Sequence, residues 1–526
     1  MSAAVTAAAR GSAAVPSIDL ERFRLRALVE PWAKAGELEV VEERIDLVDL
    51  GARLDGNPKA VLFRAAGPEK AEVVGNVMGS RRRLALSMGL SEKELRAETT
   101  RRLAMEIAPV EVSSSQAPVH QVVWTGKDAD FTRLPVHLQH SEDGGPYISA
   151  SIDITRSLDG SKRNVGYRRM MLRGRHEAGI DLIAPSDLRA LYAEYVKRKE
   201  RMPVAFVVGS HPADGIAATS MSAVADEVAL MGALRGAAVP LVRCATIDAH
   251  VPADAEVVLE GYLDERGWVE SEGPYGEYVG YYGMMKTNPV FHLTAVTMRR
   301  DALFQTITIG GRALANTDTA QLCALRTEVA AWSALLTAVR EPLAVYATAS
   351  AGGMHNLRVA LRQRYPGEVR NAIAAVFASS ADVKNVFIVD EDIDIFSDSQ
   401  MDWALATRFQ PDRDLVVQGG FRCVPLDPSL LGSRTGAKAG FDLTFPFGWN
   451  RETDFRVPEA PRLAARPRQT VSESLQAGPK SFRELMEATG SRDGRDVVIA
   501  LDSVRQQSGL DRTKDGRYQI RGEMKS

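Results

Sequence analysis

Residues 271–283, which read SEGPYGEYVGYYG, restrict the possible structures of this chain more than any other stretch. Two glutamates, Glu272 and Glu277, stand five residues apart with a Gly-Pro pair between them. The Gly-Pro pair excludes a helix, and the apolar alternation is too short for an ordinary strand. We therefore predict a tightly prescribed turn or loop. Two carboxylates in fixed relation can settle at different pKa values, which suits proton transfer; the alternative is a surface turn with solvated acids.

Composition indicates an ordinary globular protein, with 45% hydrophobic and 25% charged residues. Its 526 residues correspond to three or four domains of about 150 residues. The net charge of −3 gives no reason to expect nucleic acid or a membrane as partner. The three cysteines form neither a metal motif nor a disulfide framework, and no apolar run reaches the roughly 20 residues of a membrane span, so we expect a cytoplasmic protein. Residues 1–18 lack the apolar segment of a signal peptide and are predicted to be a disordered tail.

The order of predicted elements divides the chain into four regions and indicates a multidomain α/β (α+β) fold. Helices and strands mix over residues 19–125, and strands dominate residues 126–320, where two helical segments interrupt a barrel-like sheet. Helices and strands alternate over residues 321–461, as in an α/β domain, and NLRVALRQRY within that region is predicted to be a helix. Residues 462–526 begin with a Pro-rich linker, and the two helices and a hairpin that follow suggest a small winged-helix-like module.

Several ordered motifs resemble the UbiD-type decarboxylases, which use prenylated FMN. EGPYGEYVGYYG resembles the signature loop of that family, and NVGYRRMM resembles its Asn-then-Arg motif. Agreement continues through ADEVALMGALRG, a long segment beginning KNVFIVDEDID, and AKAGFDLT, so that the match runs from about residue 70 to 445. The resemblance implies an N-terminal α/β domain, a central split β-barrel that binds prenylated FMN, and a C-terminal α/β domain. It also implies a homodimer or higher homo-oligomer and a flavin prenyltransferase as the supplier of the cofactor.

The implied reaction is the reversible, non-oxidative decarboxylation of an aromatic, heteroaromatic or α,β-unsaturated carboxylic acid. Loss of CO2 from such an acid would leave a carbanion on an sp² carbon, which no side chain stabilises, so an organic electron sink is required. The sequence contains no haem attachment motif and no nicotinamide glycine fingerprint. The resemblance supplies prenylated FMN as the sink.

Three residues match the family's catalytic Glu-Arg-Glu network. Glu277 corresponds to the acid that protonates the carbon which has lost CO2, and Arg169 and Glu272 complete the network, with Arg169 also contacting the cofactor. Because arginine pairs with carboxylates and keeps its proton, it can hold Glu272 ionised while Glu277 stays protonated. For Arg169 alone, the alternative is a surface ion pair.

The resemblance also implies a divalent metal, typically Mn2+, with K+ nearby, at the flavin phosphate. Asn164 and Glu227 match two metal ligands that also bind the cofactor, and both offer oxygen, which suits a hard cation. The family's third ligand is histidine, and this sequence departs from that pattern. Asp187 stands eighteen residues after Arg169, where some members have the histidine, and His176 is the nearby histidine, at a shorter distance. The alternative for Asp187 is a helix N-cap. Lys384 resembles a family lysine near the cofactor, and its alternative is an exposed residue at a strand end.

Residues 304–311 and the loop around Leu430 and Leu431 are candidate walls of a mainly apolar substrate pocket, and we expect Tyr281 and Tyr282 to be packing residues. Two other functions remain open. One is a flavin-dependent oxidoreductase on a split barrel, which would need a nicotinamide site. The other is a non-catalytic protein that binds flavin or metal.

Overall fold

The computed structural model describes residues 18–220, 224, 226–380, 382–449, 455–464 and 469–521. The chain divides into two compact units, residues 1–447 and 448–526. The predicted disordered tail lies, except for Ile18, outside the described residues. None of the helices in the described part combines the length and the apolar character that a membrane span requires.

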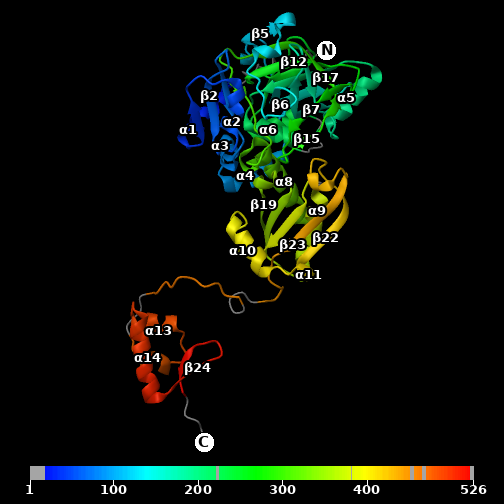
Figure 1. Ribbon diagram of the computed structural model, residues 1–526. Coiled ribbons are helices and arrows are strands. Elements are labelled where there is room, and N and C mark those ends of the chain that lie inside the picture. Colours follow the sequence, from blue (N-terminus) through cyan, green and yellow to red (C-terminus); the bar gives the residue numbers. More distant parts are fainter. Residues whose placement is uncertain are drawn as a thin grey trace, which may run out of the picture. The chain divides into compact units, whose positions relative to one another are not determined.

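The N-terminal region is a small sheet with helices beside it (Figure 1). Its strands run in the order β1–β2–β3–β18, and β18 comes from much later in the chain. Ser80 caps α3 through a hydrogen bond from the Arg83 backbone, and a reciprocal capping box of Ser91 and Glu94 starts α4. The elements are α1 (Val29–Lys34), β1 (Leu38–Val41), α2 (Leu50–Leu54), β2 (Ala60–Ala66), β3 (Ala71–Gly75), α3 (Arg81–Ser87), α4 (Glu92–Leu103) and β18 (Phe304–Gln305).

The central region is a closed barrel, as predicted. Its six strands follow the order β12–β9–β6–β7–β8–β17, a pairing between β12 and β17 closes the ring, and β5 adds to β17. The barrel strands and β5 are β5 (Val122–Thr125), β6 (Tyr147–Arg156), β7 (Arg163–Leu172), β8 (Glu177–Ile180), β9 (Met202–Val208), β12 (Val257–Leu263) and β17 (Val290–Met298). The inserted helices and the strands of a small side sheet are α5 (Asp187–Arg198), α6 (Pro212–Thr219), α7 (Glu227–Arg235), β4 (Val110–Glu111), β10 (Pro240–Arg243) and β11 (His250–Pro252).

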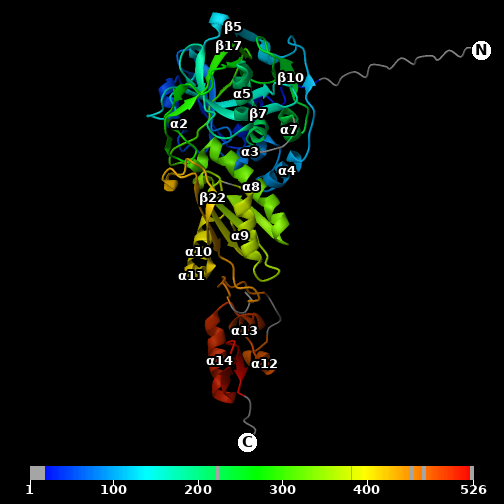
Figure 2. The same ribbon diagram turned by 90° about the vertical axis from the view of Figure 1, so that its right-hand side faces the viewer.

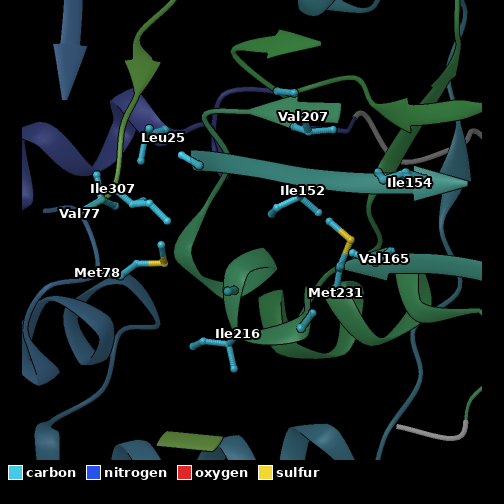
Figure 3. Packing of buried hydrophobic residues seen from close by; sticks show 14 of the residues in the cluster. Leu25, Val77, Met78, Ile152, Ile154, Val165, Val207, Ile216, Met231 and Ile307 are labelled. Atoms are coloured by element: carbon cyan, nitrogen blue, oxygen red, sulfur yellow. The ribbon is translucent and has the colours of Figure 1, made fainter. Parts of the chain in front are cut away.

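Apolar packing fixes the barrel against α6 and α7. Almost every residue of β6 is buried, as expected for a strand covered on both faces. Figure 3 shows barrel side chains beside helix side chains in one cluster: Ile152, Ile154, Val165, Val207, Ile216 and Met231. This packing holds β6 and β7, which carry much of the candidate site, in a fixed position.

The C-terminal region of the first unit is a five-stranded sheet with helices, as the alternating pattern predicted. The helix predicted for NLRVALRQRY is wrong, because residues 356–361 form β20. Leu357, Val359 and Leu361 are buried at a spacing of two, which is the period of a strand. Figures 1 and 2 both label α8, α9, α10, α11 and β22 of this region. Its elements are α8 (Asp318–Ala338), β19 (Pro342–Ala347), β20 (Asn356–Leu361), α9 (Glu368–Ser379), β21 (Asn385–Val389), α10 (Asp398–Arg408), α11 (Pro411–Asp414), β22 (Leu415–Arg422) and β23 (Thr435–Asp442).

The second unit contains three helices and a hairpin around its own small core. The prediction of two helices and a hairpin missed α12, which begins within the predicted linker. A capping box between Thr470 and Glu473 explains that helix, because it satisfies backbone donors at the N-terminus. The elements are α12 (Val471–Gln476), α13 (Phe482–Thr489), α14 (Gly494–Ser508), β24 (Leu510–Arg512) and β25 (Tyr518–Ile520).

Candidate active site

The stretch that holds the two glutamates is a pair of nested hairpins rather than an irregular loop. The outer pair joins β13 (Glu270–Glu272) to β16 (Lys286–Asn288), and the inner pair joins β14 (Tyr275–Gly276) to β15 (Tyr282–Gly283). Gly273 connects β13 to β14 with a φ of +102°, which side chains rarely allow. The nested pairing fixes the separation of the two carboxylates through backbone hydrogen bonds.

Arg169, on β7, lies between both glutamates. Its Nε is 3.0 Å from Oε1 of Glu272 and its Nη2 is 3.1 Å from Oε2, while its Nη1 donates to Oε1 of Glu277 at 2.8 Å. The guanidinium also lies over the ring of Tyr275, 4.4 Å from the centroid. The structure thus brings the three predicted catalytic side chains together, and both glutamates are buried.

Glu272 is surrounded by hydrogen-bond donors. Tyr147 donates to Oε1 at 2.9 Å and Asn288 donates to Oε2 at 3.1 Å, in addition to the two contacts from Arg169. A carboxylate accepts at both oxygens, whereas a carboxylic acid would have to use one of them as a donor. The surroundings of Glu272 therefore match a carboxylate.

Two further charged residues, Asp181 and Lys286, belong to the same cluster and were missed by the sequence analysis. Nζ of Lys286 lies 3.0 Å from Oε1 of Glu277 and 3.0 Å from Oδ2 of Asp181. Asp181 is also 3.0 Å from Nη2 of Arg169. Burial acts to raise the pKa of Asp181, but Arg169 and Lys286 bring that pKa below its ordinary value.

The charges of this cluster do not balance when all five groups are ionised. Three carboxylates, of Glu272, Glu277 and Asp181, face two cations, Arg169 and Lys286, so full ionisation leaves one net negative charge. Oε1 of Glu277 accepts from both cations, but no hydrogen bond from a described residue reaches Oε2. Oε2 of Glu277 therefore stays open to a further partner.

A histidine–aspartate pair fixes the backbone next to Glu277. Oδ1 of Asp143 accepts from the backbone N–H of Gly276 at 2.9 Å. Its Oδ2 lies 2.9 Å from the backbone nitrogen of His140 and 3.2 Å from Nδ1 of that ring. The backbone of Gly144, the residue after Asp143, lies close to the backbone of Gly273. A Cβ on Gly144 would be 2.1 Å from the carbonyl oxygen of Gly273, so only glycine fits there without a shift.

A cavity of about 360 Å³ lies behind this loop, between it and the N-terminal region. Ile307 and Thr308 line it, whereas Leu430 and Leu431 are not among its lining residues. The side chains of Arg169, Glu272 and Glu277 do not line it either, so the predicted substrate-pocket walls stay predictions. The expectation that Tyr281 and Tyr282 are packing residues is wrong. Both line the cavity and are 62% and 41% exposed, because the short inner hairpin turns them outward.

The predicted metal ligands form a second cluster, at the other end of β7. Asn164 donates to Oδ2 of Asp153 at 2.5 Å, and Oε2 of Glu227 accepts from the backbone of Val165 at 2.6 Å. Burial, together with the negative charges of Asp187 and Asp153, raises the pKa of Glu227 to about 7. This accumulation of oxygen ligands and negative charge suits a hard cation. Among the described residues, however, no three His, Cys, Asp or Glu side chains are arranged to hold a metal ion.

The two alternatives for the third ligand lie in different places. Asp187 is the first residue of α5 and acts on Glu227 electrostatically, and the N-cap is Ser186 rather than Asp187. His176 follows the far end of β7, and its Nδ1 lies 2.6 Å from the carbonyl oxygen of Ala129. Residues 164 and 172 alone are roughly 26 Å apart along a strand. The geometry favours Asp187 over His176.

Two of the four predicted cofactor residues, Asn164 and Arg169, lie on β7 but in different clusters. Their spacing of five is odd, so their side chains leave the strand on opposite faces. Lys384 precedes β21 and donates to Oδ2 of Asp427 at 2.7 Å and to Oγ of Ser429 at 2.6 Å. Within the described residues it has no recorded contact with either cluster.

Known proteins resemble the chain over most of its length. Family models for the N-terminal, Rift-related and C-terminal domains of 3-octaprenyl-4-hydroxybenzoate carboxy-lyase match residues 30–103, 110–313 and 320–443. An anhydromevalonate phosphate decarboxylase of Methanosarcina mazei is 28% identical over 412 residues, which are 78% of this chain and 93% of the relative.

Solved protein structures are also similar to this chain over most of its length. The UbiD-class enzyme HmfF from Pelotomaculum thermopropionicum, in complex with FMN, is 30% identical with a TM-score of 0.79, covering 83% of this chain and 97% of that one. An evolved dimeric form of HmfF contains prFMN and is similar at 29% identity and a TM-score of 0.74, with coverage of 83% and 97%. Apo 3,4-dihydroxybenzoic acid decarboxylase from Klebsiella pneumoniae is 26% identical with a TM-score of 0.77, covering 86% and 99%. The chain therefore belongs to the UbiD family and is a carboxy-lyase.

Proposed function

We propose that this protein catalyses the reversible, non-oxidative decarboxylation of an aromatic, heteroaromatic or α,β-unsaturated carboxylic acid with prenylated FMN. The observation that supports this most strongly is the buried contact of Arg169 with both Glu272 and Glu277. A surface ion pair, the alternative for Arg169, does not describe a guanidinium whose two glutamate partners are buried.

Each of the three residues has a distinct role. Glu272 remains a carboxylate and, with Tyr147 and Asn288, orients Arg169. Arg169 holds Oε1 of Glu277, so that Oε2 carries the proton. When CO2 has left, Glu277 transfers that proton to the carbon atom, and in the direction of carboxylation it accepts the proton back. Bound prenylated FMN supplies the electron sink that side chains cannot provide.

Asn164, Glu227 and Asp187 are proposed to hold Mn2+ at the phosphate of the cofactor, with K+ nearby. The support is chemical, because amide and carboxylate oxygens suit a hard divalent cation. The negative charge around Glu227, whose pKa burial and two nearby acids raise to about 7, is the second support, since a cation would neutralise it. Lys384 is proposed to approach the cofactor after exchanging its contact with Asp427.

The names of the relatives bear on the proposed class of substrate. Their names include decarboxylases of 3,4-dihydroxybenzoic acid and of anhydromevalonate phosphate, so the family's substrates are not confined to aromatic acids. We propose a flavin prenyltransferase as the supplier of the cofactor. A homodimer or higher homo-oligomer is proposed because an evolved form of HmfF is dimeric.

The test uses protein co-expressed with a flavin prenyltransferase. Absorbance and mass spectra of the released cofactor should identify prenylated FMN. The loaded protein, incubated with a panel of aromatic and unsaturated acids, should release CO2 without any nicotinamide. A requirement for NADH would favour the oxidoreductase, and bound flavin with no turnover of any acid would favour the non-catalytic binder.

A further inference from the structure

We propose that Lys286 and Asp181 are opposing positioning residues that keep a single proton on Glu277, an inference that rests on the proposed role of Glu277 as proton donor. Neither residue belongs to the three that the motifs single out. Strand pairing places both residues next to the trio. Lys286 lies directly opposite Glu272 in the register of β13 and β16, and Asp181 follows β8. Each contacts a member of the trio at 3.0 Å.

The two residues act on Glu277 with opposite sign. The Lys286 ammonium, 3.0 Å from Oε1, favours the ionised form of Glu277. Asp181 contacts the same ammonium and the same guanidinium that Glu277 uses, so it competes for both cations and opposes ionisation. Charged or phenolic groups surround Glu277 from several elements. These groups are Arg169 from β7, Lys286 from β16, Glu272 from β13, Asp181 after β8, His140 and Asp143 before β6, and Tyr275 and Tyr278 from its own loop.

The charge balance explains why both residues are needed. With Lys286 and Asp181 present, a protonated Glu277 leaves two carboxylates facing two cations. Removal of Lys286 alone leaves the cluster short of positive charge, so Glu277 should hold its proton more tightly and donate it less readily. Removal of Asp181 alone leaves Glu277 with one acid fewer competing for the two cations, so Glu277 should lose its proton at a lower pH.

The experiment compares three variants, Lys286→Met, Asp181→Asn and the double variant, in protein loaded with prenylated FMN. The readout is the pH at which turnover falls on the alkaline side, where the donor loses its proton. For Lys286→Met this limb should move to higher pH, and for Asp181→Asn to lower pH, each by about one to three units. The double variant should return towards the wild type, and Lys286→Arg, which keeps the charge, should stay close to it.

A second readout depends neither on substrate nor on cofactor. Infrared difference spectroscopy of the cofactor-free protein should show a protonated carboxyl band that disappears in Glu277→Gln. The pH at which this band is lost should shift in the same two directions in Lys286→Met and Asp181→Asn. If no acid is turned over but the band shifts as described, the proposed function fails and the inference about protonation survives.

Two exposed substitutions with the same charge change, Lys197→Met and Asp248→Asn, serve as controls and should leave both readouts unchanged. Shifts of equal sign in Lys286→Met and Asp181→Asn would overturn the inference. So would unshifted profiles in both, because residues that only support the fold do not move a titration in opposite directions.

Discussion

Arg169 Nη1 lies 2.8 Å from Oε1 of Glu277, on the oxygen that Lys286 also contacts. The remaining nitrogens of the guanidinium face Glu272 and Asp181. Burial acts to lower the pKa of Arg169, but the three carboxylates raise it well above its ordinary value. A single cation therefore organises three acids, and its removal should affect stability as well as turnover.

Arg169→Met should destabilise the protein by about 3–5 kcal/mol, since it leaves Glu272 buried without its cation. Urea unfolding of the cofactor-free protein measures this difference. Adding Glu272→Gln should recover part of the loss, because the uncompensated charge is then gone. Arg243→Met is the control for the loss of an arginine charge, as Arg243 is 70% exposed and its partner Asp248 is exposed as well. Equal stability of Arg169→Met and the wild type would contradict the account.

Metal retention should separate the two candidates for the third ligand. Asp187→Ala and Glu227→Ala should lose bound Mn2+, because each removes an oxygen from the acidic cluster at the start of β7 and α7. His176→Ala should keep the metal, since its ring lies against Ala129. Elemental analysis of purified protein gives the result. Retention in Asp187→Ala together with loss in His176→Ala would reverse the assignment.

The stability of the metal-free protein should fall as the pH rises from about 4.5 to about 7 because of Glu227, whose pKa is raised from 4.5 to about 7 by burial and by nearby Asp187 and Asp153. The folded state binds this proton more tightly than the unfolded chain, so the stabilisation is complete below the lower value and lost above the higher one. Unfolding midpoints at about pH 5 and about pH 8 measure the difference.

Glu227→Gln provides the control for this pH dependence. The glutamine cannot ionise, so the variant should show a smaller fall in stability between the two pH values than the wild type. Mn2+ added at the higher pH should restore stability to the wild type and not to the variant. An identical fall in both proteins would exclude Glu227 as its source.

The barrel and the α/β regions could be predicted because local periodicity indicates them, and the proximity of Arg169, Glu272 and Glu277 was implied by motifs that resemble the UbiD family. Lys286 and Asp181 could not, since their importance depends on strand pairing between distant segments. The register of Glu272 against Lys286 would have revealed Lys286, had residues 271–283 been interpreted as part of a hairpin rather than as a loop.

The wrong helix at residues 356–361 has a similar origin. NLRVAL contains good helix formers, but its position in the sheet between β19 and β21 decides its structure. The cluster around the predicted metal ligands also depends on a contact that the sequence could not reveal. Asp153 contacts Asn164 across neighbouring strands, and no spacing in the sequence indicates that contact.

The most direct test of the central claim is Glu277→Gln in protein loaded with prenylated FMN and assayed in D2O. Glutamine keeps the size of the side chain and removes the transferable proton, so the variant should retain the cofactor by absorbance and release product at least about 100-fold more slowly. The wild type should place deuterium on the carbon that carried the carboxylate. Glu270→Gln, on β13 of the same nested hairpin and half-exposed, should behave as the wild type. A Glu277→Gln variant that turns over as fast as the wild type, with the same deuterium in its product, would contradict the account.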